Sequence, residues 1–217
     1  MNRYRIKGII FDMDNTILRS KIDFEAMKRE IFRLLTSNGI IREDFPVARH
    51  TTSTLIQYAQ SHPGPTEDLL SEMWNIAEKY EVIGMQDADL EPGAAGLLDQ
   101  LRGICSMVIV TNNSIHAAKT ALSRNHIEHY FDHIIGREQM ASMKPAPDGF
   151  HVALQLYPEI KTEEWISVGD AWIDGKAAQE AGVRFISYRG NLAKMSEHGV
   201  YPFGSIDQIG DLLPYLA

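Results

Sequence analysis

Apolar segments alternate with helical segments along the second half of this chain, and this alternation limits the folds that are open to it. The segments with apolar or β-branched character are candidate strands. They cover residues 107–110, 133–135, 165–168 and 183–188, and the helices between them cover about 93–102, 116–125, 147–156 and 175–181. Alternation of this kind predicts a parallel sheet with helices on both of its faces.

A fifth apolar run, residues 6–11, lies near the start of the chain and reads as a buried parallel strand of the same sheet. Between it and the other strands, residues 19–88 show helical periodicity and no convincing strand, with a helix breaker at 61–65 and Thr66 placed to start the next helix. We therefore expect an α/β fold: a Rossmann-like, doubly wound parallel sheet formed by residues 1–18 and 89–217, with residues 19–88 as an inserted all-helical subdomain.

Composition limits the classes of partner. The chain has 217 residues, of which 44% are hydrophobic, so it can bury a sizeable core. Its formal net charge of -8 gives no electrostatic footprint for nucleic acid or for an anionic membrane surface. No apolar run approaches the length of a membrane span. We expect neither a nucleic-acid partner nor a membrane partner.

The single cysteine, Cys105, cannot form an internal disulfide bond. Its apolar neighbours Ile104 and Met107 indicate a small buried hydrophobe, and no motif places a partner histidine for a catalytic thiol. A reducing, cytoplasmic setting is the expectation.

Two acids, Asp12 and Asp14, directly follow the first predicted strand. In open α/β sheets, ligands bind beyond the carboxyl ends of the strands, so these acids are candidates for a site. A calcium loop is excluded, because its template asks for Gly and Glu where this chain has Ile17 and Asp23. A solvated acidic turn explains this segment alone equally well.

Three further segments carry groups that are suited to phosphate chemistry. Thr111 and Asn112 follow the strand at 107–110 and precede a helix, where an anion is favoured, although polar residues often only cap helices. Lys144 precedes a proline pair, and a solvated lysine is its commoner fate. Asp170 ends the strand at 165–168 after a glycine, and Asp174 follows four residues later, where acids also stabilise a helix N-terminus.

In their order, these segments resemble the motifs of the haloacid dehalogenase superfamily, in its phosphatase branch and of the phosphoglycolate-phosphatase-like type. The resemblance covers the α/β part, about two thirds of the chain, and implies that the helical section is a cap that closes over the site. It rests on these residues: Asp12-Met-Asp14-Asn-Thr16, Thr111-Asn112, Lys144-Pro145-Ala-Pro147, and Gly169-Asp170 with Asp174.

The resemblance implies a role for each acid. Asp12 is expected to be the nucleophile that forms an aspartyl-phosphate, and Asp14 the general acid and base. Thr16 is expected to orient Asp14. Mg²⁺ is the implied cofactor, held by the carboxylates of Asp12 and Asp170 and by the backbone carbonyl of Asp14. An Asp at position 14 favours phosphatase over dehalogenase chemistry.

The same resemblance implies that Thr111 and Asn112 bind the transferring phosphoryl group and that Lys144 compensates its charge and that of Asp12. Asp174 is expected to support Lys144 or a metal-bound water. The implied substrate is a small phosphorylated molecule, and the protein is expected to be a monomer or a homodimer. A sugar phosphomutase using the same nucleophile and a non-catalytic binding protein with this fold stay as alternatives.

Two features of the chain are less specific. In the helical section, Arg42, Arg49, His50 and the hydroxyl run at 51–54 could touch a leaving group, but a solvated helix face explains them equally well. His126, His129 and His133 could be imagined as metal ligands, although surface or packing roles suit their spacing better.

Asn15, where many relatives have glycine, is a residue that also tolerates unusual backbone angles.

Overall fold

The structure is a computed structural model that describes residues 5–217, so the first four residues of the segment predicted to span 1–18 lie outside it. The described chain divides into two compact units. One comprises the chain up to Ser20 together with Ala88–Ala217, and the other comprises Lys21–Asp87. We refer to them as the core unit and the helical unit. None of the helices that the structure describes combines the length and the apolar character of a membrane span.

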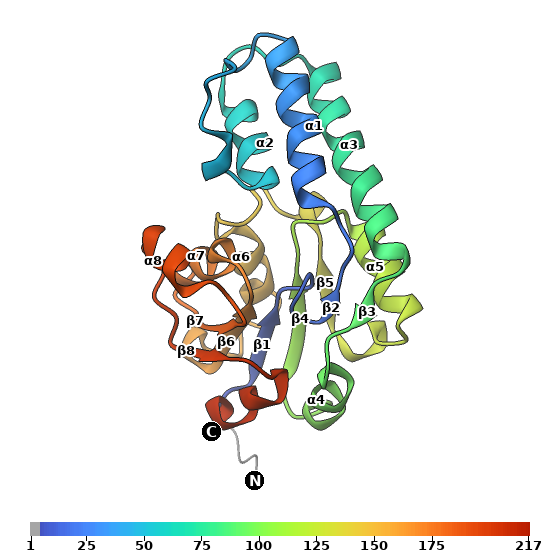
Figure 1. Ribbon diagram of the computed structural model, residues 1–217. Coiled ribbons are helices and arrows are strands. Elements are labelled where there is room, and N and C mark those ends of the chain that lie inside the picture. Colours follow the sequence, from blue (N-terminus) through green and yellow to red (C-terminus); the bar gives the residue numbers. More distant parts are fainter. Residues whose placement is uncertain (1–4) are drawn as a thin grey trace. The chain divides into compact units, whose positions relative to one another are not determined.

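A six-stranded, wholly parallel sheet forms the centre of the core unit (Figure 1). Its strand order is β5-β4-β1-β6-β7-β8. The strands are β1 (Gly8–Phe11), β4 (Ser106–Val110), β5 (His133–Ile135), β6 (Trp165–Gly169), β7 (Arg184–Tyr188) and β8 (Gly204–Ile206). The first strand in the sequence thus lies in the interior of the sheet, between β4 and β6.

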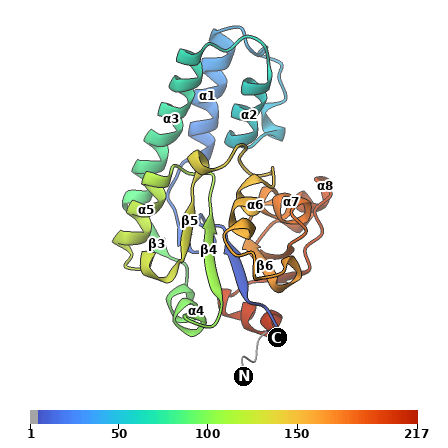
Figure 2. The ribbon, with the colours of Figure 1, turned by 180° about the vertical axis from the view of Figure 1, so that it is seen from behind.

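Helices cover both faces of this sheet (Figures 1 and 2). On one side lie α4 and α5, and on the other lie α6, α7 and α8. The helices are α4 (Ala94–Leu101), α5 (Ile115–Arg124), α6 (Asp148–Gln155), α7 (Trp172–Glu180) and α8 (Leu192–Glu197). A 3₁₀ helix, η5 (Ile209–Leu216), packs against α4 near the C-terminus. This arrangement confirms the predicted doubly wound α/β fold.

Burial on both faces explains why the central strands read as continuous apolar runs. Ile9, Ile10 and Phe11 in β1 are at most 1% exposed. The buried thiol of Cys105 donates a hydrogen bond to the carbonyl of Ile6 over 3.4 Å. Desolvation raises the pKa of this thiol to about 11, so it stays protonated at neutral pH. Cys105 thus packs as a small hydrophobe.

A two-stranded antiparallel ribbon marks the place where the chain leaves the core unit and returns to it. Its strands are β2 (Leu18–Arg19) and β3 (Asp89–Leu90), in a register that pairs Leu18 with Leu90 and Arg19 with Asp89. This ribbon was not predicted, because strands of two residues show no periodicity in the sequence.

The helical unit contains three helices, α1 (Phe24–Ser37), α2 (Thr52–Ser61) and α3 (Glu67–Gln86), and the short η1 (Val47–Arg49). Thr66 caps α3 by accepting a hydrogen bond from the backbone N–H of Leu69, at the position predicted for a helix start. Gly84 allows α3 to approach the backbone of Ile22 closely, because a Cβ at Gly84 would lie 2.5 Å from its backbone atoms.

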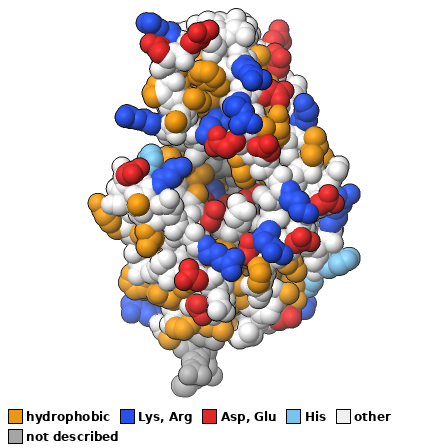
Figure 3. Space-filling view, in the orientation of Figure 1, with side chains coloured by type: hydrophobic (Ala, Val, Ile, Leu, Met, Phe, Trp, Pro, Cys, Tyr) orange, Lys and Arg blue, Asp and Glu red, His pale blue; other side chains and the backbone are white. Residues whose placement is uncertain are grey.

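The surface of the chain carries both signs of charge. On the face drawn in Figure 3, lysine and arginine side chains are interspersed with aspartate and glutamate side chains.

Candidate active site

Three neighbouring strands end at the same edge of the sheet, each followed by a polar residue. The register pairs Phe11 of β1 with Ile109 of β4 and Val168 of β6. Asp12 therefore directly follows the interior strand, and its backbone N–H still donates to the carbonyl of Val168 over 2.9 Å. Thr111 and Asp170 follow the two flanking strands. The topology thus brings together three residues that are far apart in the sequence.

A tight turn after β1 positions the second acid. The carbonyl of Met13 accepts hydrogen bonds from the backbone N–H groups of Ile17 and Leu18, both over 3.0 Å. Asn15 adopts the left-handed conformation with φ 54°, which agrees with its expected tolerance. The turn returns Thr16 toward the strand end, where its hydroxyl donates to Oδ2 of Asp12 over 3.3 Å. Thr16 was expected to orient Asp14, but its hydroxyl donates to Asp12.

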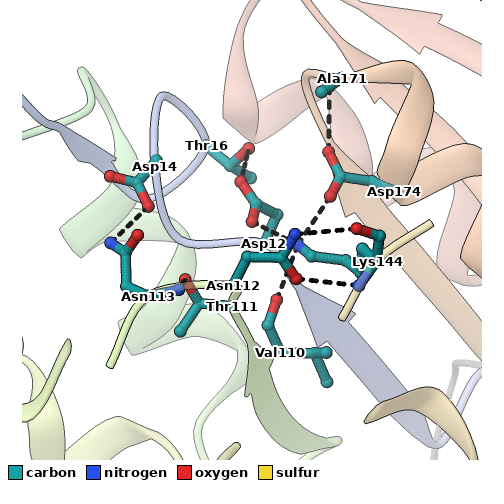
Figure 4. A network of polar contacts seen from close by, with 10 residues as sticks. All are labelled: Asp12, Asp14, Thr16, Val110, Thr111, Asn112, Asn113, Lys144, Ala171 and Asp174. Carbon is teal, nitrogen blue, oxygen red and sulfur yellow. Dashed lines mark hydrogen bonds and ion pairs between the residues drawn. The ribbon is translucent and has the colours of Figure 1, made fainter. Parts of the chain in front are cut away.

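Lys144, which is labelled in Figure 4, is the buried cation of the site. Only 2% of its surface is exposed. Its Nζ donates to Oδ1 of Asp12 and to Oδ1 of Asp174, both over 2.6 Å, and to the carbonyl of Val110 over 2.9 Å. Burial alone would lower the pKa of Lys144, but the two carboxylates raise it above its ordinary value. The ammonium group is therefore charged and fixed between two acids.

The amide nitrogen and the amide oxygen of Asn112 both bind the backbone of Lys144. The amide Nδ2 donates to the carbonyl of Lys144, and Oδ1 accepts from the backbone N–H of Lys144, each over 2.9 Å. This double contact ties the loop after β4 to the segment before α6 (Figure 4). The Asn112 side chain thus positions the backbone of Lys144, and its role in binding the phosphoryl group stays a prediction.

Thr111 is buried, and its hydroxyl accepts a hydrogen bond from the backbone N–H of Asn113 over 3.2 Å. Asn113 in turn donates from Nδ2 to Oδ2 of Asp14 over 2.8 Å (Figure 4). Asn113 was not among the predicted site residues. The sequence did carry a signal for it, since it stands in the polar run after β4, but that run alone did not say which member faces Asp14.

Asp174 lies in the first turn of α7 and is 2% exposed. Besides its ion pair with Lys144, Asp174 accepts a hydrogen bond at Oδ2 from the backbone N–H of Ala171 over 3.0 Å. Gly169 leaves the room for this carboxylate, because a Cβ at that glycine would lie 2.6 Å from Oδ2 of Asp174. Of its two expected partners, Asp174 is thus placed against Lys144.

Negative charge accumulates at this edge of the sheet. Asp12, Asp170 and Asp174 each offer a carboxylate oxygen within 4.8 Å of the others. Burial is the main cause that raises the pKa of Asp12 to about 6, with Lys144 opposing it and Asp174 adding to it. Burial, followed by Asp12 and then Asp174, also raises the pKa of Asp170 well above its usual value. One lysine does not compensate three carboxylates.

The carboxylates match the donor set of a divalent cation. Hard oxygen ligands, two or more of them charged, are what Mg²⁺ and Ca²⁺ prefer. The raised pKa values of Asp12 and Asp170 point the same way, since they report a site that needs more positive charge than Lys144 provides. The residues present therefore fit a bound cation.

The candidate residues of the helical unit mostly have local roles. Thr51 and Thr54 form a capping box at the start of α2. Arg42 is exposed and pairs with Asp44 over 3.3 Å. The ring of His50 packs against Phe45, with ring centroids 4.9 Å apart, and burial lowers its pKa.

The three histidines that were considered as metal ligands line one surface hollow but do not form a metal-ligating cluster. Among the described residues, the only cluster of three or more potential metal-ligating side chains is that of Asp12, Asp170 and Asp174. His129 packs on the ring of Tyr130, and His133 contacts the ring of Tyr157 edge-on. Packing roles therefore explain two of them.

Comparison with known proteins gives consistent results. The family model described as "Haloacid dehalogenase-like hydrolase" matches residues 9–188. A phosphoglycolate phosphatase of Cereibacter sphaeroides is 28% identical over 226 residues, which cover 96% of this chain and 98% of that protein. The pyrophosphatase PpaX of Bacillus mycoides is 28% identical over 228 residues, covering 98% of each chain.

A solved structure supports the fold. CbbY from Rhodobacter sphaeroides, crystallised in complex with phosphate, superposes with a TM-score of 0.68 at 22% identity, covering 97% of this chain and 99% of that chain. The family match includes the segments that carry Asp12, Thr111, Lys144 and Asp170. The resemblance seen in the sequence is thereby confirmed, and the chain belongs to the haloacid dehalogenase-like hydrolase family.

Proposed function

We propose that this protein is a magnesium-dependent phosphatase that hydrolyses a small phosphate monoester through an aspartyl-phosphate intermediate. The observation that carries the proposal is the environment of Asp12. Its carboxylate lies at the end of an interior strand, 9% exposed, with one oxygen 2.6 Å from the Lys144 ammonium and the other 3.3 Å from the Thr16 hydroxyl. A fixed, desolvated carboxylate that keeps some exposure is suited to attack on phosphorus.

In the first step, an oxygen of Asp12 bonds to phosphorus and the bond from phosphorus to the substrate's ester oxygen breaks. Asp14 gives its proton to the departing oxygen, which leaves as an alcohol. In the second step, Asp14 takes a proton from water, whose oxygen bonds to phosphorus as the bond to Asp12 breaks. Inorganic phosphate leaves, and both acids return to their starting state.

The other residues stabilise charge around the transferring phosphoryl group. Lys144 offers its ammonium beside Asp12, and Thr111 offers a hydroxyl at the adjacent strand end. Asn112 and Asp174 hold Lys144 by its backbone and by its side chain, respectively. The carboxylates of Asp12 and Asp170 and the backbone carbonyl of Asp14 would hold Mg²⁺, which when bound neutralises part of the charge of the phosphoryl group and the carboxylates.

The helical unit, Lys21–Asp87, is proposed to act as the cap of this enzyme. Caps in such enzymes exclude water and select the substrate. Among relatives, one is named for phosphoglycolate and another for pyrophosphate. The substrate of this protein is therefore best sought among small soluble phosphate esters.

The proposal is tested by measuring phosphate release from 2-phosphoglycolate, pyrophosphate and several sugar phosphates, with Mg²⁺ and with a chelator. We expect release from at least one ester that stops when the chelator is added. An isomerised sugar phosphate without net phosphate release would instead identify a phosphomutase. No turnover of any kind, together with tight binding of a phosphorylated compound, would identify a non-catalytic binding protein.

Asn113 offers a test of the role of Asp14. Replacing it with alanine removes the 2.8 Å hydrogen bond that orients the Asp14 carboxylate. General acid catalysis contributes about 10²–10⁴-fold, so a partly misplaced acid is expected to lower kcat about tenfold for alkyl phosphates. For p-nitrophenyl phosphate, whose leaving group needs little protonation, the loss should be much smaller.

A matched control is Asn38→Ala, which removes an amide hydrogen bond of 2.9 Å at the end of α1 in the helical unit. We expect it to leave kcat unchanged for both kinds of substrate. Equal losses for alkyl and aryl phosphates in Asn113→Ala would argue against a role through Asp14.

A further inference from the structure

Gly190 lies in the turn between β7 and α8, directly against the backbone of Asp170. A Cβ added at Gly190 would lie 2.6 Å from the backbone carbonyl oxygen of Asp170, 2.5 Å from Oγ of Ser187 and 2.4 Å from Cε of Met195. The hydroxyl and the methyl group can rotate away, but the carbonyl belongs to the main chain. A side chain at position 190 must therefore displace either its own turn or Asp170.

The turn is held in place by several hydrogen bonds. The hydroxyl of Tyr188 and the guanidinium of Arg189 both donate to Oε2 of the buried Glu91, over 2.7 and 3.1 Å. The backbone N–H of Arg189 donates to the carbonyl of Ile206 over 2.9 Å. Arg189 also donates from Nε to the carbonyl of Asp207 over 2.7 Å. The turn is therefore expected to resist displacement.

The Asp170 segment lies beyond the last paired residues of β6. The strand pairing of β6 with β7 ends where Gly169 faces Ser187, one residue before Asp170. The Asp170 carboxylate lies within 4.8 Å of those of Asp12 and Asp174. A small shift of the Asp170 backbone therefore changes the spacing of the acids that are proposed to hold the cation.

We propose that Gly190 is a positioning residue for Asp170: its missing side chain sets where the backbone of Asp170 lies, and through it the geometry of the carboxylate cluster. This inference rests on the proposed function, since it concerns the affinity of the same site for Mg²⁺. It adds a residue from a turn that none of the family motifs described above includes.

The test is to titrate Mg²⁺ into the full chain by calorimetry without substrate, comparing wild type with Gly190→Ala. Residues behind metal ligands typically change metal affinity 10–100-fold, so we expect the variant to bind Mg²⁺ at least about tenfold more weakly. The Mg²⁺ concentration for half-maximal phosphate release should rise by a similar factor, while kcat at saturating Mg²⁺ changes much less. Gly96→Ala in α4 is the matched control, because a Cβ there has no atom within 4 Å.

A variant background separates the contact with the Asp170 backbone from the contacts with the Ser187 and Met195 side chains. In a Ser187→Ala, Met195→Ala background, the added Cβ of Gly190→Ala still meets the Asp170 carbonyl but no longer meets Oγ or Cε. Persistent weakening of Mg²⁺ binding supports the proposal. Restored affinity in this background overturns it, and the background also keeps the test open if the single variant does not fold.

The two proposals fail in different ways. A wild-type protein that releases phosphate with Mg²⁺, beside a Gly190→Ala variant with unchanged Mg²⁺ affinity, would overturn the role of Gly190 and leave the phosphatase standing. A wild-type protein that neither binds Mg²⁺ nor releases phosphate would overturn both.

Discussion

Replacing Asp12 with asparagine is expected to lower phosphate release more than about 10³-fold, the scale seen when an enzyme loses its nucleophile. Asparagine keeps the shape of the side chain, and its oxygen can still accept a hydrogen bond from Lys144. It lacks the anionic oxygen that attacks phosphorus, so the aspartyl-phosphate cannot form. The measurement is single-turnover phosphate release in saturating Mg²⁺, with the labelled phosphoenzyme sought by acid quenching.

The same variant should not lose stability. The pKa of Asp12 is raised to about 6, chiefly by burial, which means that the fold disfavours the charged carboxylate. A neutral isostere removes that penalty and leaves Lys144 paired with Asp174, so we expect urea unfolding in chelator to occur at the same or a higher concentration. Asp44→Asn, at an exposed acid of the helical unit, is the control for the loss of one charge. Retained magnesium-dependent turnover in Asp12→Asn would refute the mechanism.

Replacing Lys144 with methionine is expected to lower both activity and stability. The ammonium group is 2% exposed and is paired with Asp12 and Asp174. Removing one partner of a buried ion pair leaves uncompensated charge and typically costs about 3–5 kcal/mol of unfolding free energy. Methionine fills a similar volume, so the loss reports charge rather than a cavity. The measurement is urea unfolding of the full chain in the presence of chelator.

Lys176→Met provides the comparison, because Lys176 forms a partly exposed pair with Glu180 on the surface of α7. Such pairs contribute about 0–1 kcal/mol, so the control should unfold almost like the wild type. If Lys144→Met loses no more stability than Lys176→Met, then Lys144 does not hold the carboxylates together as described.

Most of the sheet could be predicted from the sequence because its interior strands are buried on both faces. Such strands are mostly apolar, as β1, β4 and β6 are, and each is directly followed by a polar residue. The edge strand β8 and the helix α8 escaped prediction. β8 has three residues, one exposed and one half-buried, and α8 buries only Met195, so neither produces a periodic pattern.

The acids of the candidate site could be predicted because they come at or shortly after the ends of predicted strands in the sequence. The contacts of the side chains around them could not be predicted. That the Asn112 side chain contacts the backbone of Lys144 depends on where a distant loop passes. Likewise, the contact of Asn113 with Asp14 joins residues ninety-nine positions apart. The space that Gly190 leaves for Asp170 is visible only in three dimensions, since nothing local distinguishes this glycine from the others.

In the helical unit, helix capping accounts for more of the candidate residues than substrate contact does. The hydroxyl run at 51–54 looked like a candidate for substrate contact, yet Thr51 and Thr54 cap α2 together. A helix N-terminus needs such partners for its unpaired N–H groups, which is why hydroxyl residues gather there.

The interior position of β1 also affects how the chain is made. Gly8 pairs with Ser106 on one side and with Trp165 on the other, so the strand that carries Asp12 finds its neighbours only after much of the chain has been synthesised. The helices of Lys21–Asp87 contact one another within a short stretch of sequence and are complete well before that. On the ribosome, this apolar strand would therefore stay unpaired until β4 and β6 have been synthesised. Long-range pairing of this kind slows folding and exposes a strand to aggregation, so this segment is where we expect chaperones to bind the nascent chain.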